Sequence, residues 1–223
     1  MTRSEVLYWL NDQRLNSLVD SKWANLDKEF LAVQEQIPAP HKMVREEISF
    51  HDHVKLLGCL TVICQDVIGD ILEIGVWKGK SLALMHRLAE SGRVIYGIDP
   101  LELPNQAAEQ NYYNKCIYPE VKVLRAYSEL AILEFNRICK KLALLHIDGG
   151  HLGKNVVLDF LLYEHFVSPG GYIVFDDYSD YTSSPEVGPA VDLLRIGGFF
   201  SNYEIFGTVP RFNNSYLLRK ISC

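Results

Sequence analysis

The sequence lacks the features that mark secreted, membrane-spanning and nucleic-acid-binding proteins. Its five cysteines contain no Cys-x-x-Cys pair and are odd in number, so they support neither a zinc knuckle nor a disulfide framework, and they suit a reducing compartment. No apolar run approaches the roughly 20 residues of a membrane span. A net charge of -6 offers no basic surface to a phosphate backbone. We therefore expect a cytoplasmic protein that acts on a small molecule and has no nucleic-acid or membrane partner.

The glycine-rich segment at residues 70–81 also lacks both common phosphate-binding signatures. It is one residue too short for a phosphate loop, which would need a glycine at Ile74, and a dinucleotide-binding turn would need one at Trp77. The remaining pattern, E-x-G-x-x-x-G, begins with Glu73 at the end of a short apolar run. Because a carboxylate repels phosphates and attracts a cation or ribose hydroxyls, we expect a ligand without phosphate.

After residue 50 the sequence contains a regular alternation of strand-like and helical segments. Hydrophobic residues make up 48% of the 223 residues, which is enough for a substantial core. The alternation predicts an α/β fold with a mostly parallel sheet and helices on both faces, ending in an antiparallel hairpin. The predicted strands are 71–74, 94–98, 121–124, 142–147, 172–175 (entered through a Pro-Gly-Gly turn at 169–171), 200–206 and 214–219. The predicted helices between them are 80–90, 105–114, 128–140, 153–166 and 186–195.

Residues 1–36 carry apolar side chains at helical spacing and end before the segment Pro38-Ala-Pro40. We expect one or two helices there and a further helix at 51–68. The N-terminal helices either pack on the core, or form a lid over the active site or a surface for homo-oligomers. The chain thus divides into an N-terminal helical lid or cap segment, 1–50, and a ligand-binding domain, 51–223.

Acidic residues stand at the ends of the predicted strands, where open parallel sheets bind their ligands. Glu73 ends the first strand, and Asp99 ends the second, 26 residues later. This spacing is near that at which an acidic residue binds ribose hydroxyls in nucleoside-binding α/β folds. The alternative for Asp99 is a structural role, either as a helix N-cap or as a turn residue before Pro100.

Three aspartates follow the fourth and fifth strands: Asp148, Asp176 and Asp177. Adjacent parallel strands lie about 5 Å apart, so these carboxylates would converge and repel one another unless a cation or a shared proton offsets their charge. Hard oxygen ligands with open coordination positions suit magnesium best. The alternative is that Asp176 caps a loop and Asp177 is solvated.

Four further polar residues are candidates for the site. His151 lies three residues after Asp148, in a glycine turn, and suits removal of a proton from a hydroxyl; alternatively it caps the next helix or packs beside the ligand. Ser128, after the third strand, either contacts a base ring or caps a helix. His51 and His53 precede the first strand and could line the pocket entrance, although single histidines are more often structural.

Four motifs occur in an order and spacing that together resemble a known family. The chain resembles class I S-adenosylmethionine-dependent methyltransferases, in particular the small metal-dependent O-methyltransferases related to macrolide-sugar enzymes and to the cephalosporin-hydroxylase-like group. The likeness covers residues 50–219. The motifs are L-E-I-G-V-W-K-G-K-S at 72–81, Y-G-I-D-P at 96–100, L-H-I-D-G-G-H at 145–151 and P-G-G-Y-I-V-F-D-D-Y at 169–178.

The resemblance implies a Rossmann-like methyltransferase fold with seven strands, S-adenosylmethionine as cofactor, and magnesium or another hard divalent cation. It also assigns roles to residues that match the family's motifs. The implied cofactor-binding residues are Glu73, Gly75, Gly79 and Ser81 around the methionine part, Asp99 at the ribose, Ser128 by the adenine, and Asp148. The implied metal ligands are Asp148, Asp176 and Asp177.

The resemblance leaves the catalytic base open. Catechol-type relatives have a lysine three residues after the first metal aspartate, where this chain has His151, so the base is either His151 or Asp148. The implied activity is O-methylation of a small-molecule hydroxyl, on a sugar diol or a catechol-like ring, as in natural product biosynthesis. Two alternatives remain: a cofactor-binding module that is non-catalytic or depends on a partner, and a phosphate-loop nucleotide enzyme using Lys80.

Overall fold

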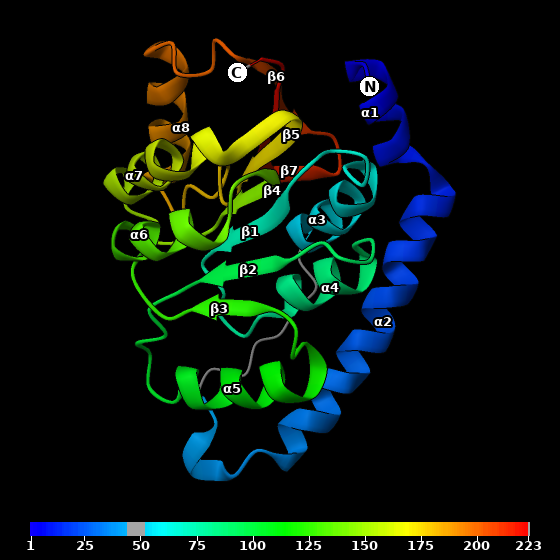
Figure 1. Cartoon of the computed structure of the whole chain (residues 1–223), viewed down its shortest axis with the longest axis vertical. Helices are drawn as coiled ribbons and strands as arrows, with labels where there is room; N and C mark the ends of the chain where they lie inside the picture. Colours follow the sequence, from blue (N-terminus) through cyan, green and yellow to red (C-terminus); the bar gives the residue numbers. More distant parts are fainter. Residues whose placement is uncertain (44–51, 223) are drawn as a thin grey trace.

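The computed structural model describes residues 1–43 and 52–222, apart from the side chains at 52 and 213, and His51 lies outside this part of the chain. Its centre is a seven-stranded sheet in the order β3-β2-β1-β4-β5-β7-β6 (Figure 1). β1 to β5 are parallel, and β7 runs antiparallel to both β5 and β6. The predicted α/β fold with a C-terminal antiparallel hairpin is therefore confirmed. The strands are β1 (Asp70–Ile74), β2 (Ile95–Ile98), β3 (Lys122–Leu124), β4 (Leu142–Ile147), β5 (Val167–Phe175), β6 (Tyr203–Val209) and β7 (Phe212–Lys220).

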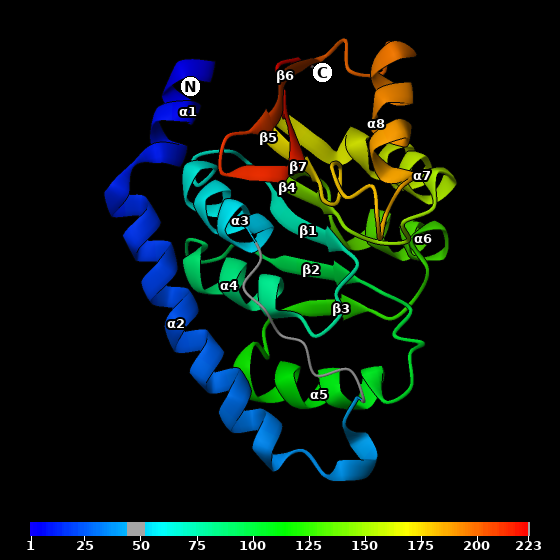
Figure 2. The ribbon, with the colours of Figure 1, turned by 180° about the vertical axis from the view of Figure 1, so that it is seen from behind.

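Helices cover both faces of the sheet (Figures 1 and 2). Alternate strand residues point to opposite faces, so Ile71 joins the core under one set of helices and Leu72 the core under the other. The first set is α3 (Asp52–Ile63), α4 (Lys80–Leu88) and α5 (Gln106–Ile117). The second set is α6 (Ser128–Ile138), α7 (Gly153–Tyr163) and α8 (Val187–Ile196). Two short 3-10 turns complete the described helices, η1 (Ala39–His41) and η2 (Glu164–Phe166).

The N-terminal segment forms two helices, α1 (Arg3–Asn11) and α2 (Gln13–Gln36), as expected. Thr2 and Glu5 form a capping box at the start of α1, and the side chain of Asp12 caps α2. α2 runs along the outside of α3, α4 and α5, and its apolar side chains join their core (Figure 2). Both helices therefore lie against the side of the domain. No helix in the described ranges is long and apolar enough to cross a membrane.

The fifth strand differs from its prediction. It begins at Val167, so the Pro-Gly-Gly segment lies inside the strand and does not precede it. Between Leu142 and Leu144 of β4 the register with β5 shifts, which makes this segment a bulge. Pro169 has no N–H to donate and Gly170 adopts φ +87°, and a bulge tolerates both. The strand interior after the bulge leads directly to the aspartates at its end.

Candidate functional site

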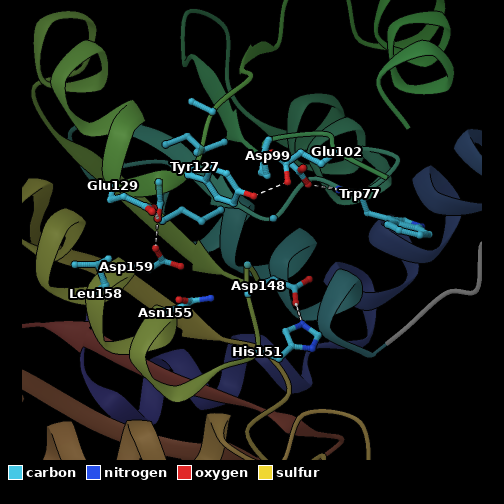
Figure 3. A pocket seen from close by; sticks show the side chains of 18 of the residues that line it. Trp77, Asp99, Glu102, Tyr127, Glu129, Asp148, His151, Asn155, Leu158 and Asp159 are labelled. Carbon is cyan, nitrogen blue, oxygen red and sulfur yellow. Dashed lines mark hydrogen bonds and ion pairs between the residues drawn. The ribbon is translucent and has the colours of Figure 1, made fainter. Parts of the chain in front are cut away.

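A cavity of about 580 Å³ opens at the carboxyl ends of β1, β2 and β4 (Figure 3). Gly75 turns the chain away from β1 at φ +92°, and a Cβ there would lie 1.9 Å from the carbonyl oxygen of Asp148. Only glycine allows the loops after β1 and β4 to approach so closely. Of the residues predicted for the site, the cavity is lined by Gly75, Asp99, Ser128, Asp148 and His151.

Asp99 organises the turn on which the cavity is built. Its Oδ2 accepts the backbone N–H groups of Val76 and Trp77 at 2.8 and 3.0 Å. Its Oδ1 accepts the N–H of Leu101 at 2.7 Å. Trp77 has φ +50°, a conformation that non-glycine residues rarely adopt, and the hydrogen bond to Asp99 stabilises it. Asp99 therefore has the structural role in a turn that the sequence left as an alternative, while its carboxylate still lines the cavity. Its contact with ribose remains a prediction.

The far end of the cavity contains residues that the motifs did not indicate. Asp159, on α7, is only 3% exposed, and its carboxylate accepts a hydrogen bond from the hydroxyl of Ser128. Burial raises the pKa of Asp159 to about 6, partly offset by that hydrogen bond. At the rim the phenol of Tyr127 donates to Glu102 (Figure 3). Ser128 is the first residue of α6 and does not cap it, since Tyr127 holds the N-cap position.

Three predicted cofactor residues lie outside the cavity lining. Glu73 is fully buried beneath the edge of the sheet, with Oε1 2.9 Å from Nδ1 of His146. Gly79, at φ +77°, packs against the hydroxyl of Tyr118, and Ser81 lies half-buried in α4. The contribution of these three residues to a methionine-binding site stays a prediction.

Lys80 also lies away from the cavity. Its Nζ is 2.9 Å from Oδ1 of Asp27 on α2 and sits over the rings of Trp23 and Phe30 at 5.2 and 5.3 Å. Burial lowers the pKa of Lys80. The lysine of the G-K-S sequence thus attaches α2 to α4, which is not the place of a phosphate-loop lysine.

The three predicted metal ligands gather at the ends of β4 and β5. The register pairs Ile147 with Phe175, so Asp148 and Asp176 leave neighbouring strands at the same level. Asp176 is 5% exposed, and its Oδ1 accepts a hydrogen bond of 3.0 Å from Ser215. Burial opposes ionisation of Asp176, but the charge and hydrogen bond of His53 outweigh it and lower the pKa to about 2.

Asp177 follows in a strained backbone conformation, φ +57°. Its Oδ1 accepts from the side-chain amide of Asn214 at 2.8 Å, and its Oδ2 accepts from the hydroxyl of Ser184 at 2.7 Å. Asp176 and Asp177 are therefore both hydrogen-bonded, neither being simply solvated.

A histidine joins the aspartates in each of two groups at this edge, which together we call the acidic cluster. Potential ligand atoms lie within 4.8 Å of one another in two groups that share Asp148, an inner group with His53 and Asp176, and an outer group with His151 and Asp177. Nδ1 of His53 is 3.0 Å from Oδ2 of Asp176. From the sequence we expected His53 at the pocket entrance or in a structural role. Its position in the acidic cluster depends on how α3 crosses the sheet edge, for which the sequence has no local signal.

His151 lines the cavity, and its hydrogen bonds determine which ring nitrogen is free to accept a proton. Because Ser184 donates its one proton to Asp177, Nδ1 of His151, at 2.7 Å from the same hydroxyl, acts as the donor to it. Nε2 is then the nitrogen that can accept a proton, and it lies 3.4 Å from Asp177 and 3.8 Å from Asp148. The nearby carboxylate of Asp148, together with that of Asp177, raises the pKa of His151. Leu152, not His151, is the N-cap residue of α7.

The chain matches known proteins in sequence and in fold. A family profile described as "Methyltransferase domain" matches residues 72–178. Uncharacterized protein R132 of Acanthamoeba polyphaga mimivirus is 34% identical over 184 residues, covering 76% of this chain and 82% of the viral protein.

Solved structures show the same fold. The O-methyltransferase NovP has a TM-score of 0.64 at 19% identity, with 90% of this chain and 100% of NovP covered. An O-methyltransferase from Bacillus cereus in complex with SAH has a TM-score of 0.62 at 16% identity, with 91% of each chain covered. Residues 72–178 therefore match a methyltransferase domain, the chain belongs to the same family as protein R132, and its fold is that of class I O-methyltransferases, as the four motifs predicted.

Proposed function

We propose that the protein transfers a methyl group from S-adenosylmethionine to a hydroxyl oxygen of a small molecule, with the help of a divalent cation, magnesium in the simplest case. One observation supports this proposal above all: Asp148 and His151 belong to the acidic cluster and also line the cavity beside the turn at Gly75. A substrate with two neighbouring oxygens, such as a sugar diol or a catechol-like ring, fits a cation held by few protein ligands.

The residues present fit both groups. The cavity has an acidic residue, Asp99, and an amide-rich turn, but among its described lining residues no lysine or arginine for a phosphate. Carboxylate and imidazole donors of the cluster suit a divalent cation. When bound, S-adenosylmethionine supplies a methyl group on a positively charged sulfur, and the cation lowers the pKa of a nearby hydroxyl.

The chain's own part in the reaction is to bind, orient and remove a proton. Asp99 and the turn after Gly75 hold the cofactor, and the aspartates hold the cation. His151 accepts the substrate's hydroxyl proton at Nε2, because its Nδ1–H donates to Ser184 and Ser184 donates to Asp177. Asp148, whose pKa burial raises, is the second candidate for the base.

Other parts of the proposal concern the protein as a whole. We propose residues 1–50 as a helical cap and 51–223 as the methyltransferase domain, with α1 and α2 available for homo-oligomers. Among the described residues none of 1–43 lines the cavity, so a lid role would require these helices to contact bound substrate. The buried free thiols of Cys59, Cys64 and Cys139 support a cytoplasmic setting.

The test combines cofactor binding with turnover. We expect S-adenosylmethionine and S-adenosylhomocysteine to raise the melting temperature of the protein. We also expect the protein to methylate at least one compound in a panel of diols and catechols. Product formation should stop when a chelator is added and resume with magnesium. His151→Gln should lower kcat by about 100-fold or more, in the range of general-base catalysis. The matched control is His165→Gln, an exposed histidine in η2. A protein that binds neither cofactor form would contradict the proposal.

A further inference from the structure

His53 is the residue of the acidic cluster that the methyltransferase motifs do not contain. It lies at the second position of α3, on the face of the sheet that packs against α2, and reaches the ends of β4 and β5 from that side. We propose that His53 is a nitrogen ligand of the cation, together with Asp148 and Asp176, and that this set favours a first-row transition ion such as Mn²⁺ over Mg²⁺. The inference rests on the proposed function, since it concerns the cation of the same site.

The inner group has the geometry of a small enclosed site. Nδ1 of His53 lies 3.0 Å from Oδ2 of Asp176, and the side chains are 16% and 4% exposed. An oxygen of Asp148 completes the group, in which all candidate ligand atoms lie within 4.8 Å of one another. Ser215 holds the other oxygen of Asp176 at 3.0 Å, so the carboxylate keeps Oδ2 directed at His53. A cation between these atoms would replace the ion pair with coordination by the same three side chains.

A fully buried histidine, His146, positions His53. The ring of His146 stacks beside it, with centroids 5.8 Å apart and planes inclined by 22°. His146 is in turn held by Glu73 at 2.9 Å, and both side chains are essentially inaccessible. This assigns Glu73 a positioning role behind the cluster. Such outer partners orient the residues that bind a metal and are part of the design of metal sites.

The donor set determines which ion the site prefers. A triad of three aspartates offers only oxygen, which suits Mg²⁺. In this chain Asp177 accepts hydrogen bonds from Asn214 and Ser184 and belongs to the outer group with His151. With His53 in place of Asp177 the inner group has one imidazole and two carboxylates, and imidazole nitrogen shifts preference toward transition ions.

The test measures binding without turnover. Calorimetric Kd values for Mn²⁺ and Mg²⁺ are compared in the full-length wild type, His53→Ala and His53→Gln, with His165→Gln as control. We expect the His53 variants to weaken Mn²⁺ binding by about tenfold or more and Mg²⁺ binding by less than about threefold. Pulsed electron paramagnetic resonance of bound Mn²⁺ should detect coupling to an imidazole nitrogen that disappears in both His53 variants and persists in His151→Ala. Circular dichroism confirms that each variant is folded.

Two results would overturn the inference and are distinguishable from each other. The first is that Mn²⁺ binds with unchanged affinity in the folded His53 variants, or that its nitrogen coupling depends on His151. His53 is then only an ion-pair partner of Asp176, and the proposed function stands. If the wild type binds neither ion and methyl transfer continues in chelator, the cation itself is absent from the proposed function, and the inference fails with it.

Discussion

The acidic residues at the carboxyl-terminal edge of the sheet have different kinds of partner at the two ends of that edge. At the β1–β2 end Asp99 accepts N–H groups from Val76, Trp77 and Leu101, all in adjoining turns. At the β4–β5 end Asp176 is paired with His53, which comes from α3, a helix packed on one face of the sheet and distant in the chain. The first arrangement stabilises a turn that lines the cavity, and the second gathers charged and imidazole groups that could hold a cation. In the proposed function the first is the cofactor end of this edge and the second is its metal end.

The largest expected effect comes from removing the metal end. In the double variant Asp176→Ala/Asp177→Ala we expect metal-dependent turnover to fall by about 1,000-fold or more, because cation chemistry contributes several kcal/mol to such a barrier. Binding of S-adenosylmethionine, measured by calorimetry, should change little, because the cofactor end is untouched. Asp192→Asn is the control, an acidic residue of α8 paired with Arg195 at the surface. Full activity of the double variant in chelator would show that the two ends do not differ in this way.

The cofactor end is tested by Asp99→Asn. Loss of charge-assisted hydrogen bonds to a ribose costs about 2 kcal/mol, so we expect KM for S-adenosylmethionine to rise by about 30-fold with a smaller change in kcat. Asp70→Asn is a matched control, because Asp70 accepts the N–H of Val94 at 3.0 Å at the opposite end of β1. If both variants change KM equally, Asp99 acts only through the stability of the sheet.

This comparison also explains which site residues could be predicted from the sequence. Gly75, Asp99 and Asp148 follow their strands directly, and His151 lies three residues after Asp148. Strand periodicity and motif spacing therefore place them at the correct edge, and the structure brings them to one cavity. Their positions depend on local chain direction. The same local reasoning predicted that the sheet is mostly parallel and ends in an antiparallel hairpin, but it did not predict the order of the strands.

Strand periodicity and motif spacing could not predict the contacts of residues whose partners come from elements distant in the chain. Asp159 lies in the interior of α7, and only the packing of α6 beside α7 brings Ser128 to it. Glu73 occupies the expected strand position, yet its side chain points beneath the sheet edge to His146, since strand residues alternate between faces. The motif fixes the position of a residue, whereas the tertiary fold determines what its side chain contacts.

A pH-dependence of stability tests Asp159, the buried acid at the far end of the cavity. The folded pKa of Asp159 is raised from 3.8 to about 6, so its contribution to stability is complete below the unfolded pKa and is lost as pH rises through 6. We expect the free energy of unfolding of the wild type to lose about 1.5 kcal/mol through this group between about pH 5 and about pH 7.5. Asp159→Asn should lack this loss in urea titrations, and Asp66→Asn, an exposed control, should retain it. An unchanged pH slope in Asp159→Asn would contradict the assignment.

The smallest effect on function is expected at Lys80, which belongs to neither end. Its amine is paired with Asp27 and stacked on aromatic rings of α2, so Lys80→Ala should lower stability by about 1 kcal/mol while turnover stays within about twofold. Lys55→Ala, which breaks the ion pair between α3 and Asp20 of α2, is the matched control and should behave similarly. ATP should stabilise neither variant nor the wild type in thermal-shift measurements. If ATP bound the wild type and Lys55→Ala but not Lys80→Ala, the glycine turn would be a phosphate site. Both variants lose an ion pair to α2, so a difference in ATP binding between them would mean that Lys80 contacts the phosphates.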